Sequence, residues 1–175
     1  MKLILQDRDE AFEKDLQQIY DAKADVVKII TDDGKINPCI GCFGCWIKTP
    51  TTCVIHDGYE HISADILKSE ELIIINKGAY GTYSPFIRNL LDRNLSFVLP
   101  DFTKRNREIH HKLRYDKQPV FTVYFYGDMT DKERQTAGKT VYANAINLNG
   151  VVNKIAFLSD ENAVLDAIKN SRVAV

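Results

Sequence analysis

Four consecutive apolar residues, Leu72–Ile75, constrain the fold of this chain more than any other stretch. An uninterrupted apolar run of this length is typical of a strand that is buried on both faces of a parallel sheet. Ser84 and Pro85 then mark a helix start, because a hydroxyl can cap free amides and proline suits the first helical position. Between them, 77–83 carries two glycines, two tyrosines and a threonine. Ligands in open α/β sheets bind just beyond the carboxyl ends of the strands, so this loop is predicted to form the floor of a site for a flat molecule.

Strand and helix patterns alternate along the 175 residues, which suits a single domain spanning 1–175. Apolar or β-branched runs predict further strands at 2–6, 26–30, 120–126 and 151–158. Helices are predicted between them, one opened by a capping box of Thr130 and Glu133, and 96–119 is predicted to be a long basic connection. The alternation predicts an α/β fold, a three-layer sandwich in which helices cover both faces of a five-stranded parallel sheet. We expect the strand order 2-1-3-4-5, although periodicity alone does not exclude a Rossmann-type order.

The composition is that of an ordinary soluble globular protein, with 45% hydrophobic residues and a formal net charge of -1. This charge balance argues against a protein built mainly to bind nucleic acid or an anionic membrane surface. No apolar run is long enough to cross a bilayer, and Met1 leads directly into an apolar strand without a leader segment. We therefore expect a cytoplasmic protein whose cysteines stay reduced unless they bind a metal or a cluster.

Four cysteines form a C-x2-C-x2-C-x7-C pattern, at Cys39, Cys42, Cys45 and Cys53. The closely spaced trio can offer thiolates to successive corners of a 4Fe-4S cluster, for which a remote fourth ligand is normal. Gly41 and Gly44 precede the second and third cysteines and allow the backbone to curl tightly. Zinc sites more often pair two C-x2-C units, so three cysteines in a row favour iron. Zinc, or four reduced thiols that merely pack a loop, are the alternatives, and a disulfide is not expected in the cytoplasm.

Two segments together, CIGCFGCWIKTPTTCVIHDG at 39–58 and GAYGTYSPFIRNLLDR at 78–93, resemble the NAD(P)H-dependent FMN reductase and iron–sulfur flavoprotein group of the flavodoxin superfamily. The likeness covers most of the chain, since the order of strands and helices also matches. It implies a flavodoxin-like fold that holds FMN between the loops after the third and fourth strands. Carried over by position, the resemblance implicates Gly78, Ala79, Tyr80, Gly81, Thr82, Tyr83, Ser84 and Gly127 in FMN binding.

The loop after the first strand departs from this family. Its members usually have glycine, serine, proline and arginine there, which grip the FMN phosphate, whereas this chain has DRDE at 7–10 and Glu13 one turn on. A helix N-terminus attracts one anion, either a phosphate or its own carboxylates. Three or four acids would repel a dianionic phosphate, with Arg8 as the only local compensation. The phosphate is then held from elsewhere, or the affinity is low, or flavin binding has been lost.

Other residues have competing interpretations. Tyr80 and Tyr83 can stack on a flavin or nicotinamide ring, or one of them can pack against a neighbouring loop. Thr82 and Ser84 can donate hydrogen bonds to ring oxygens, but Ser84 is better explained as a helix cap. The basic stretch at 103–117 can attract the phosphates of NAD(P)H, form a dimer contact, or be a solvated loop.

These observations predict an FMN-dependent NAD(P)H oxidoreductase that passes electrons through bound flavin to a small acceptor, such as free flavin or a quinone. No catalytic acid or base is predicted, because the cofactor carries the chemistry. The alternatives are an iron–sulfur flavoprotein that receives electrons from a partner such as ferredoxin, and a flavodoxin-like binding module that has lost FMN. By analogy with the fold, we expect a homo-oligomer.

Overall fold

The computed structural model describes residues 1–22 and 25–171, whose strands form a five-stranded sheet and a two-stranded sheet. All neighbouring strands of the larger sheet are parallel, and their order is β2-β1-β3-β6-β7. Counted within this sheet alone, the order is 2-1-3-4-5, so the predicted flavodoxin-like α/β topology is confirmed. Its strands are β1 (Lys2–Gln6), β2 (Val27–Thr31), β3 (Glu71–Lys77), β6 (Val120–Tyr126) and β7 (Val151–Leu158).

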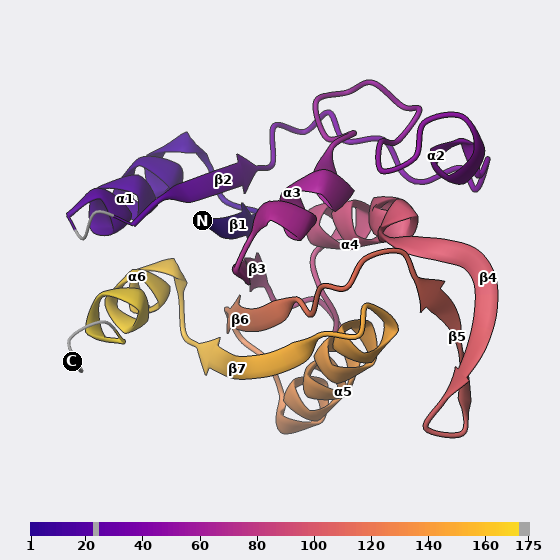
Figure 1. Ribbon diagram of the computed structural model, residues 1–175. Coiled ribbons are helices and arrows are strands. Elements are labelled where there is room, and N and C mark those ends of the chain that lie inside the picture. The colour runs from indigo at the N-terminus through magenta and orange to yellow at the C-terminus, as the bar shows by residue number, and fades with distance from the viewer. Residues whose placement is uncertain (23–24, 172–175) are drawn as a thin grey trace.

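Helices cover both faces of this sheet, with α1 and α6 on one side and α3, α4 and α5 on the other (Figure 1). Successive side chains of a strand point to opposite faces. Leu72 and Ile74 of β3 therefore pack with α3, α4 and α5, whereas Ile73 and Ile75 pack with α1 and α6. All four are at most 4% exposed, so β3 is buried on both faces as predicted. The helices are α1 (Glu10–Asp21), α2 (Gly44–Ile47), α3 (Ile62–Lys68), α4 (Pro85–Asp92), α5 (Asp131–Asn147) and α6 (Glu161–Asn170).

Short polar side chains determine where three of these helices begin. Thr130 and Glu133 form the predicted capping box of α5, in which each side chain accepts a hydrogen bond from the backbone N–H of the other residue. Asp9 and Asp160 cap α1 and α6, and each accepts a hydrogen bond from the N–H three residues further on. Within residues 1–22 and 25–171, no helix combines the length and the apolar character needed to cross a bilayer.

The prediction of a long connection at 96–119 is wrong, because this segment contains an antiparallel hairpin. The hairpin joins β4 (Val98–Arg105) to β5 (Glu108–Leu113) and follows the short 3-10 helix η1 (Arg93–Phe97). Asn106 and Arg107 connect its strands with φ values of 49° and 70°, as a type I′ turn requires. Glycine is usual at the second position of this turn, so the Asn-Arg pair carries no strong hairpin signal. In Figure 1 the hairpin extends away from the central sheet.

We expect the substitution Ile74→Ala to lower the free energy of unfolding by about 2–5 kcal/mol, because it empties a fully buried position in the central strand. Urea denaturation followed by circular dichroism measures this change. Ile109→Ala is the control, since Ile109 on β5 is 68% exposed and its loss should change the free energy of unfolding by less than about 0.5 kcal/mol. Equal losses in the two variants would contradict the central position of β3.

Candidate functional site

A cavity of about 600 Å³ lies beyond the carboxyl end of the central sheet. Its lining includes residues at the ends of four strands, namely Asp7 after β1, Asp32 after β2, Lys77 at the end of β3 and Tyr126 at the end of β6. Both this position and this volume are typical of small-molecule sites in open α/β sheets. The loop after β3 contributes four of the residues predicted from the sequence, which are Gly78, Ala79, Tyr80 and Ser84.

The tip of this loop is a tight turn. Ala79 and Thr82 exchange two backbone hydrogen bonds of 2.9 and 3.2 Å, and the two residues between them, Tyr80 and Gly81, have φ values of 51° and 75°. Two consecutive positive φ values define a type I′ turn. A Cβ atom on Gly81 would lie 2.8 Å from Cβ of Thr136 on α5, so glycine lets the turn pack closely on that helix. Tyr80 consequently stands at the tip and is 94% exposed.

The hydroxyl of Ser84 is a buried polar group without a partner. Ser84 occupies the N-cap position of α4, but its side chain makes no capping hydrogen bond, so the interpretation of this hydroxyl as a helix cap is wrong. Its backbone N–H instead donates to Oδ1 of the buried Asn76 at 3.0 Å. Its Oγ atom is buried without a hydrogen bond beside the cavity, and an unsatisfied buried group of this kind costs about 1–3 kcal/mol. Ser84 is therefore suited to donate to a bound molecule.

The other predicted loop residues lie away from this cavity. Thr82 and Tyr83 line a second cavity of about 340 Å³ between α4 and α5. The ring of Tyr83 is 2% exposed and stacks on Phe125 with 5.7 Å between centroids, and burial raises the pKa of Tyr83 to about 12. Gly127 follows β6 with a φ of 93° and does not line the first cavity. Of the two loop tyrosines, Tyr83 packs in the core and Tyr80 keeps a free ring.

Asp7 ties the ends of three strands together at the polar side of the cavity. Its Oδ2 accepts the N–H of Lys77 at 2.9 Å, and its Oδ1 accepts the hydroxyl of Tyr126 at 2.8 Å. Burial, and then the Asp7 carboxylate, raise the pKa of Tyr126, so that this hydroxyl keeps its proton. Arg8 next to it pairs with Glu161 of α6 at 3.0 Å.

The N-terminus of α1 is occupied by the carboxylates of the chain itself. Oδ1 of Asp9 accepts the N–H of Phe12 at 3.0 Å, and Glu10 and Glu13 add two acids to the same first turn. Free N–H groups at a helix start are what make it an anion site, and here the cap already uses one of them. The exposed ring of Tyr80 and the unpartnered hydroxyl of Ser84 suit a flat ligand, whereas the capped and acidic N-terminus of α1 does not suit the FMN phosphate that the family resemblance places there.

The four cysteines converge on a separate small cavity. Cys39, Cys42, Cys45 and Cys53 line a space of about 20 Å³, which holds about one water molecule. Cys39 and Cys42 are exposed and Cys53 is buried, and burial together with the neighbouring thiols raises the pKa of Cys45. Across the part of the chain that the structure describes, no three histidine, cysteine, aspartate or glutamate side chains lie close enough to bind one metal ion. The thiols are thus gathered, but not into the tight tetrahedron that zinc requires.

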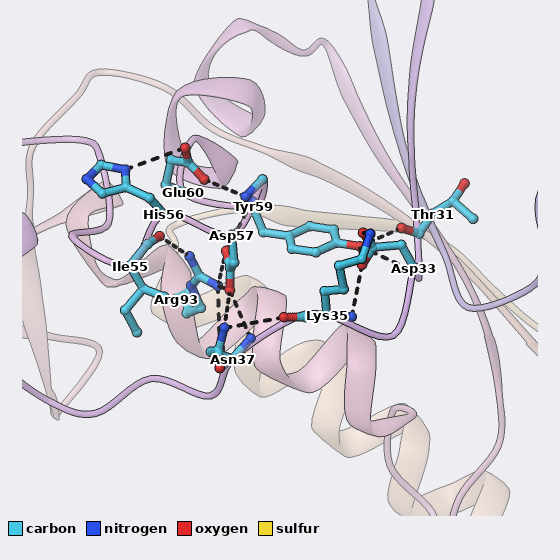
Figure 2. A network of polar contacts seen from close by, with 11 residues as sticks. Thr31, Asp33, Lys35, Asn37, Ile55, His56, Asp57, Tyr59, Glu60 and Arg93 are labelled. Carbon is cyan, nitrogen blue, oxygen red and sulfur yellow. Dashed lines mark hydrogen bonds and ion pairs between the residues drawn. The ribbon is translucent and has the colours of Figure 1, made fainter.

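A clasp of three residues, Asn37, Asp57 and Arg93, closes the base of the cysteine loop. Nη1 of Arg93 donates to both carboxylate oxygens of Asp57, at 2.6 and 2.8 Å, and Nη2 donates to the backbone oxygen of Ile55 at 2.9 Å (Figure 2). The backbone N–H of Asn37 donates to the same carboxylate at 2.9 Å. Asn37 precedes the first cysteine and Ile55 follows the last, so the clasp holds both ends of the loop together.

Trp46 anchors the middle of the loop. Its Nε1 donates to the backbone oxygens of Leu95, at 3.1 Å, and Val98, at 2.9 Å, and its ring stacks on Phe43. The cysteines therefore rest on η1 and on the start of β4. Neither this anchor nor the clasp was predicted from the sequence, because each joins residues that are far apart along the chain.

Known proteins share the fold of this chain without close sequence similarity. No family model matches the sequence, and no curated protein matches it. An FMN-dependent NADH-azoreductase from Bacillus anthracis, solved in complex with FMN, is 12% identical with a TM-score of 0.58 over 99% of each chain. An NADPH-quinone reductase from P. pentosaceus is 12% identical with a TM-score of 0.54 over 100% of this chain and 99% of that one. A flavodoxin, WrbA-like protein from Agrobacterium tumefaciens is 8% identical with a TM-score of 0.54 over 98% and 90%.

These likenesses show that the chain has a flavodoxin-like α/β fold. At identities of 8–12% they show the shared fold, and at that level they confirm the expected resemblance.

We expect the Asp57–Arg93 pair to stabilise the protein in a pH-dependent way. Burial alone would raise the pKa of Asp57, but the Arg93 guanidinium and then Asn37 lower it to about 2. The unfolded carboxyl has a pKa of about 3.9, so about 2 kcal/mol of stability is present above pH ~4 and lost as the pH falls towards ~2. Asp57→Asn should remove this component, as measured by urea denaturation at several pH values. Asp101→Asn, at an exposed position of β4, is the control and should show the same pH profile as the unmodified protein. Identical pH profiles for the unmodified protein and both variants would contradict the role of the clasp.

Proposed function

We propose that this chain is a flavin-dependent oxidoreductase that takes electrons from NAD(P)H and passes them through the flavin to a small acceptor. The observation that carries this proposal is the cavity beyond the strand ends, where the exposed ring of Tyr80 and the unpartnered hydroxyl of Ser84 border one space. The shared fold supports it, because an azoreductase solved with FMN and an NADPH-quinone reductase have the same architecture.

A bound flavin would supply the hydride and single-electron chemistry. The residues of the chain would position and shield it. Tyr80 would stack against a face of the ring, and the Ser84 hydroxyl would donate a hydrogen bond to a ring oxygen or nitrogen. Phe86 is 3% exposed and excludes water from the floor of the cavity. Tyr126 keeps its proton and stays bound to Asp7, which holds the strand ends in place during turnover.

The acceptor and the assembly are part of the same proposal. The exposed face of the cavity would admit a small flat acceptor, such as a quinone or free flavin, beside the ring. By analogy with the fold, the chain acts as a homo-oligomer in the cytoplasm.

Tyr80→Ala is expected to weaken flavin binding about two- to tenfold, because stacking of aromatic rings is worth about 0.5–1.5 kcal/mol beyond the burial of apolar area. Ser84→Ala should weaken binding as well and raise the free energy of unfolding by about 1–3 kcal/mol, since it removes a buried hydroxyl that has no hydrogen-bond partner. Fluorescence titration with flavin measures both affinities. Tyr142→Ala on α5, at a ring that is 56% exposed, is the control. If the unmodified chain binds no flavin, it is a flavodoxin-like binding module instead.

A second candidate function is electron transfer through an iron–sulfur cluster. Four thiols line one cavity, and the Arg93 side chain beside them is 0% exposed. Arg93 holds its charge paired with Asp57 and so fixes the position of the thiols beside it. Cys39 and Cys42 are exposed, so the cavity can widen on its open side. Such a carrier would receive electrons from a partner such as a ferredoxin.

Anaerobic reconstitution with ferrous iron and sulfide is expected to load about four iron atoms per chain and to produce the broad visible absorption of a 4Fe-4S cluster. Cys42→Ser should abolish this uptake, whereas Lys48→Ser, at an exposed position in the same loop, should leave it intact. Iron assay and absorption spectroscopy give the result. Uptake of no iron would contradict the cluster and indicate four reduced thiols that pack the loop. Uptake of one zinc ion in a parallel titration with zinc would indicate a zinc site instead.

A further inference from the structure

One end of the cavity, at Asp7 and next to the N-terminus of α1, is acidic, whereas the other end, at Tyr80 and Ser84, suits a flat ring. From this difference we infer that the cavity selects a flavin without a terminal phosphate, an inference that rests on the proposed function and specifies its ligand. A flavin carries its ring at one end of a polyhydroxyl chain and, in FMN, a phosphate of about -1.5 to -2 charges at the other end. The exposed Tyr80 and the unpartnered Ser84 suit the ring. The N-terminus of α1 would face the phosphate in the arrangement that the fold implies.

The N-terminus of α1 does not favour a phosphate, because its side chains are acidic and one of its first amides is already capped. Asp9 already accepts the N–H of Phe12, and Glu10 and Glu13 follow within one turn. A dianion placed there would displace the cap and approach three carboxylates. Helix dipole and cap amides favour one anion, which the chain itself provides, so a second anion meets net repulsion.

The nearby cations do not compensate for these acids. The cavity itself is lined by three other carboxylates, Asp7, Asp32 and Glu133, and by two cations. One of the cations, Arg8, is paired with Glu161 at 3.0 Å. The other, Lys77, lies over Gly127, with its Cε 3.8 Å from the position of a Cβ on that glycine. Gly127 follows β6, on the side of β3 opposite to β1 and α1. The charge of Arg8 is thus offset by Glu161, and the Lys77 side chain extends along Gly127, away from the N-terminus of α1.

Hydroxyl groups, by contrast, can form hydrogen bonds with the side chains at the acidic end of the cavity. Carboxylates accept hydrogen bonds only, and each has about four lone-pair sites, so Asp7 can accept further donors beyond Lys77 and Tyr126. The buried Nε–H of Arg8 makes no hydrogen bond and can donate to a hydroxyl oxygen. A polyhydroxyl chain supplies both donors and acceptors, whereas a phosphate dianion supplies acceptors alone. The end of the cavity near Asp7 thus favours the uncharged chain.

Titration with three flavins tests this inference. Riboflavin, FMN and lumiflavin, which has the ring without the chain, are titrated into the full chain, and binding is followed by flavin fluorescence. Riboflavin is expected to bind at least as tightly as FMN. Raising the salt concentration from about 0.05 M to about 0.5 M should tighten FMN relative to riboflavin, because salt screens the repulsion.

Asp9→Asn is the informative variant, because asparagine caps a helix about as well as aspartate while it removes the charge. It should tighten FMN binding about tenfold and leave riboflavin within about twofold. The control is Asp21→Asn, which makes the same change of net charge at the other end of α1, about 18 Å away at the rise of a 12-residue helix, and should change neither affinity.

FMN binding more than tenfold tighter than riboflavin binding, or an FMN-to-riboflavin ratio that Asp9→Asn leaves unchanged, would overturn the inference while the proposed function stands. Failure of all three flavins to bind would overturn the proposed function itself, and the inference with it.

Discussion

Burial of β3 on both faces is the constraint on which the rest of the structure depends. Leu72 and Ile74 face one helical layer and Ile73 and Ile75 face the other, so the centre of the sheet has no solvated face. Polar chemistry can then gather only at the strand ends. The carboxyl ends of four parallel strands meet at one such edge, and the cavity forms there. Asp7 fixes the geometry of this edge by bonding to the ends of β3 and β6 at once.

The sequence predicts the layers well because burial leaves a local signature. Four consecutive apolar residues indicate a doubly buried strand, and Thr130 with Glu133 indicates a helix start, since both signals lie within a few neighbouring residues. The β4–β5 hairpin was missed because its turn contains Asn106 and Arg107 without glycine. Ser84 was assigned a capping role from its position alone, and only the surrounding packing shows that its hydroxyl is unpaired.

The site was predicted less completely, because its contacts are long-range. The loop after β3 was located, but sequence spacing does not distinguish Tyr80, which is exposed, from Tyr83, which packs on Phe125. Asp57 and Arg93 are 36 residues apart, and nothing local in either segment indicates their pairing. The acids after β1 were visible in the sequence, whereas their use as a cap for α1 required the structure.

The clasp at the base of the cysteine loop has a consequence for the chemistry of the thiols. Closing a loop costs conformational entropy, and here that entropy is lost when Arg93 and Asp57 come together during folding. The four cysteines are consequently held close together, at a high effective concentration, whether or not anything binds between them. The two exposed members, Cys39 and Cys42, are also accessible to oxidants, which would act on the same sulfurs that a metal would use.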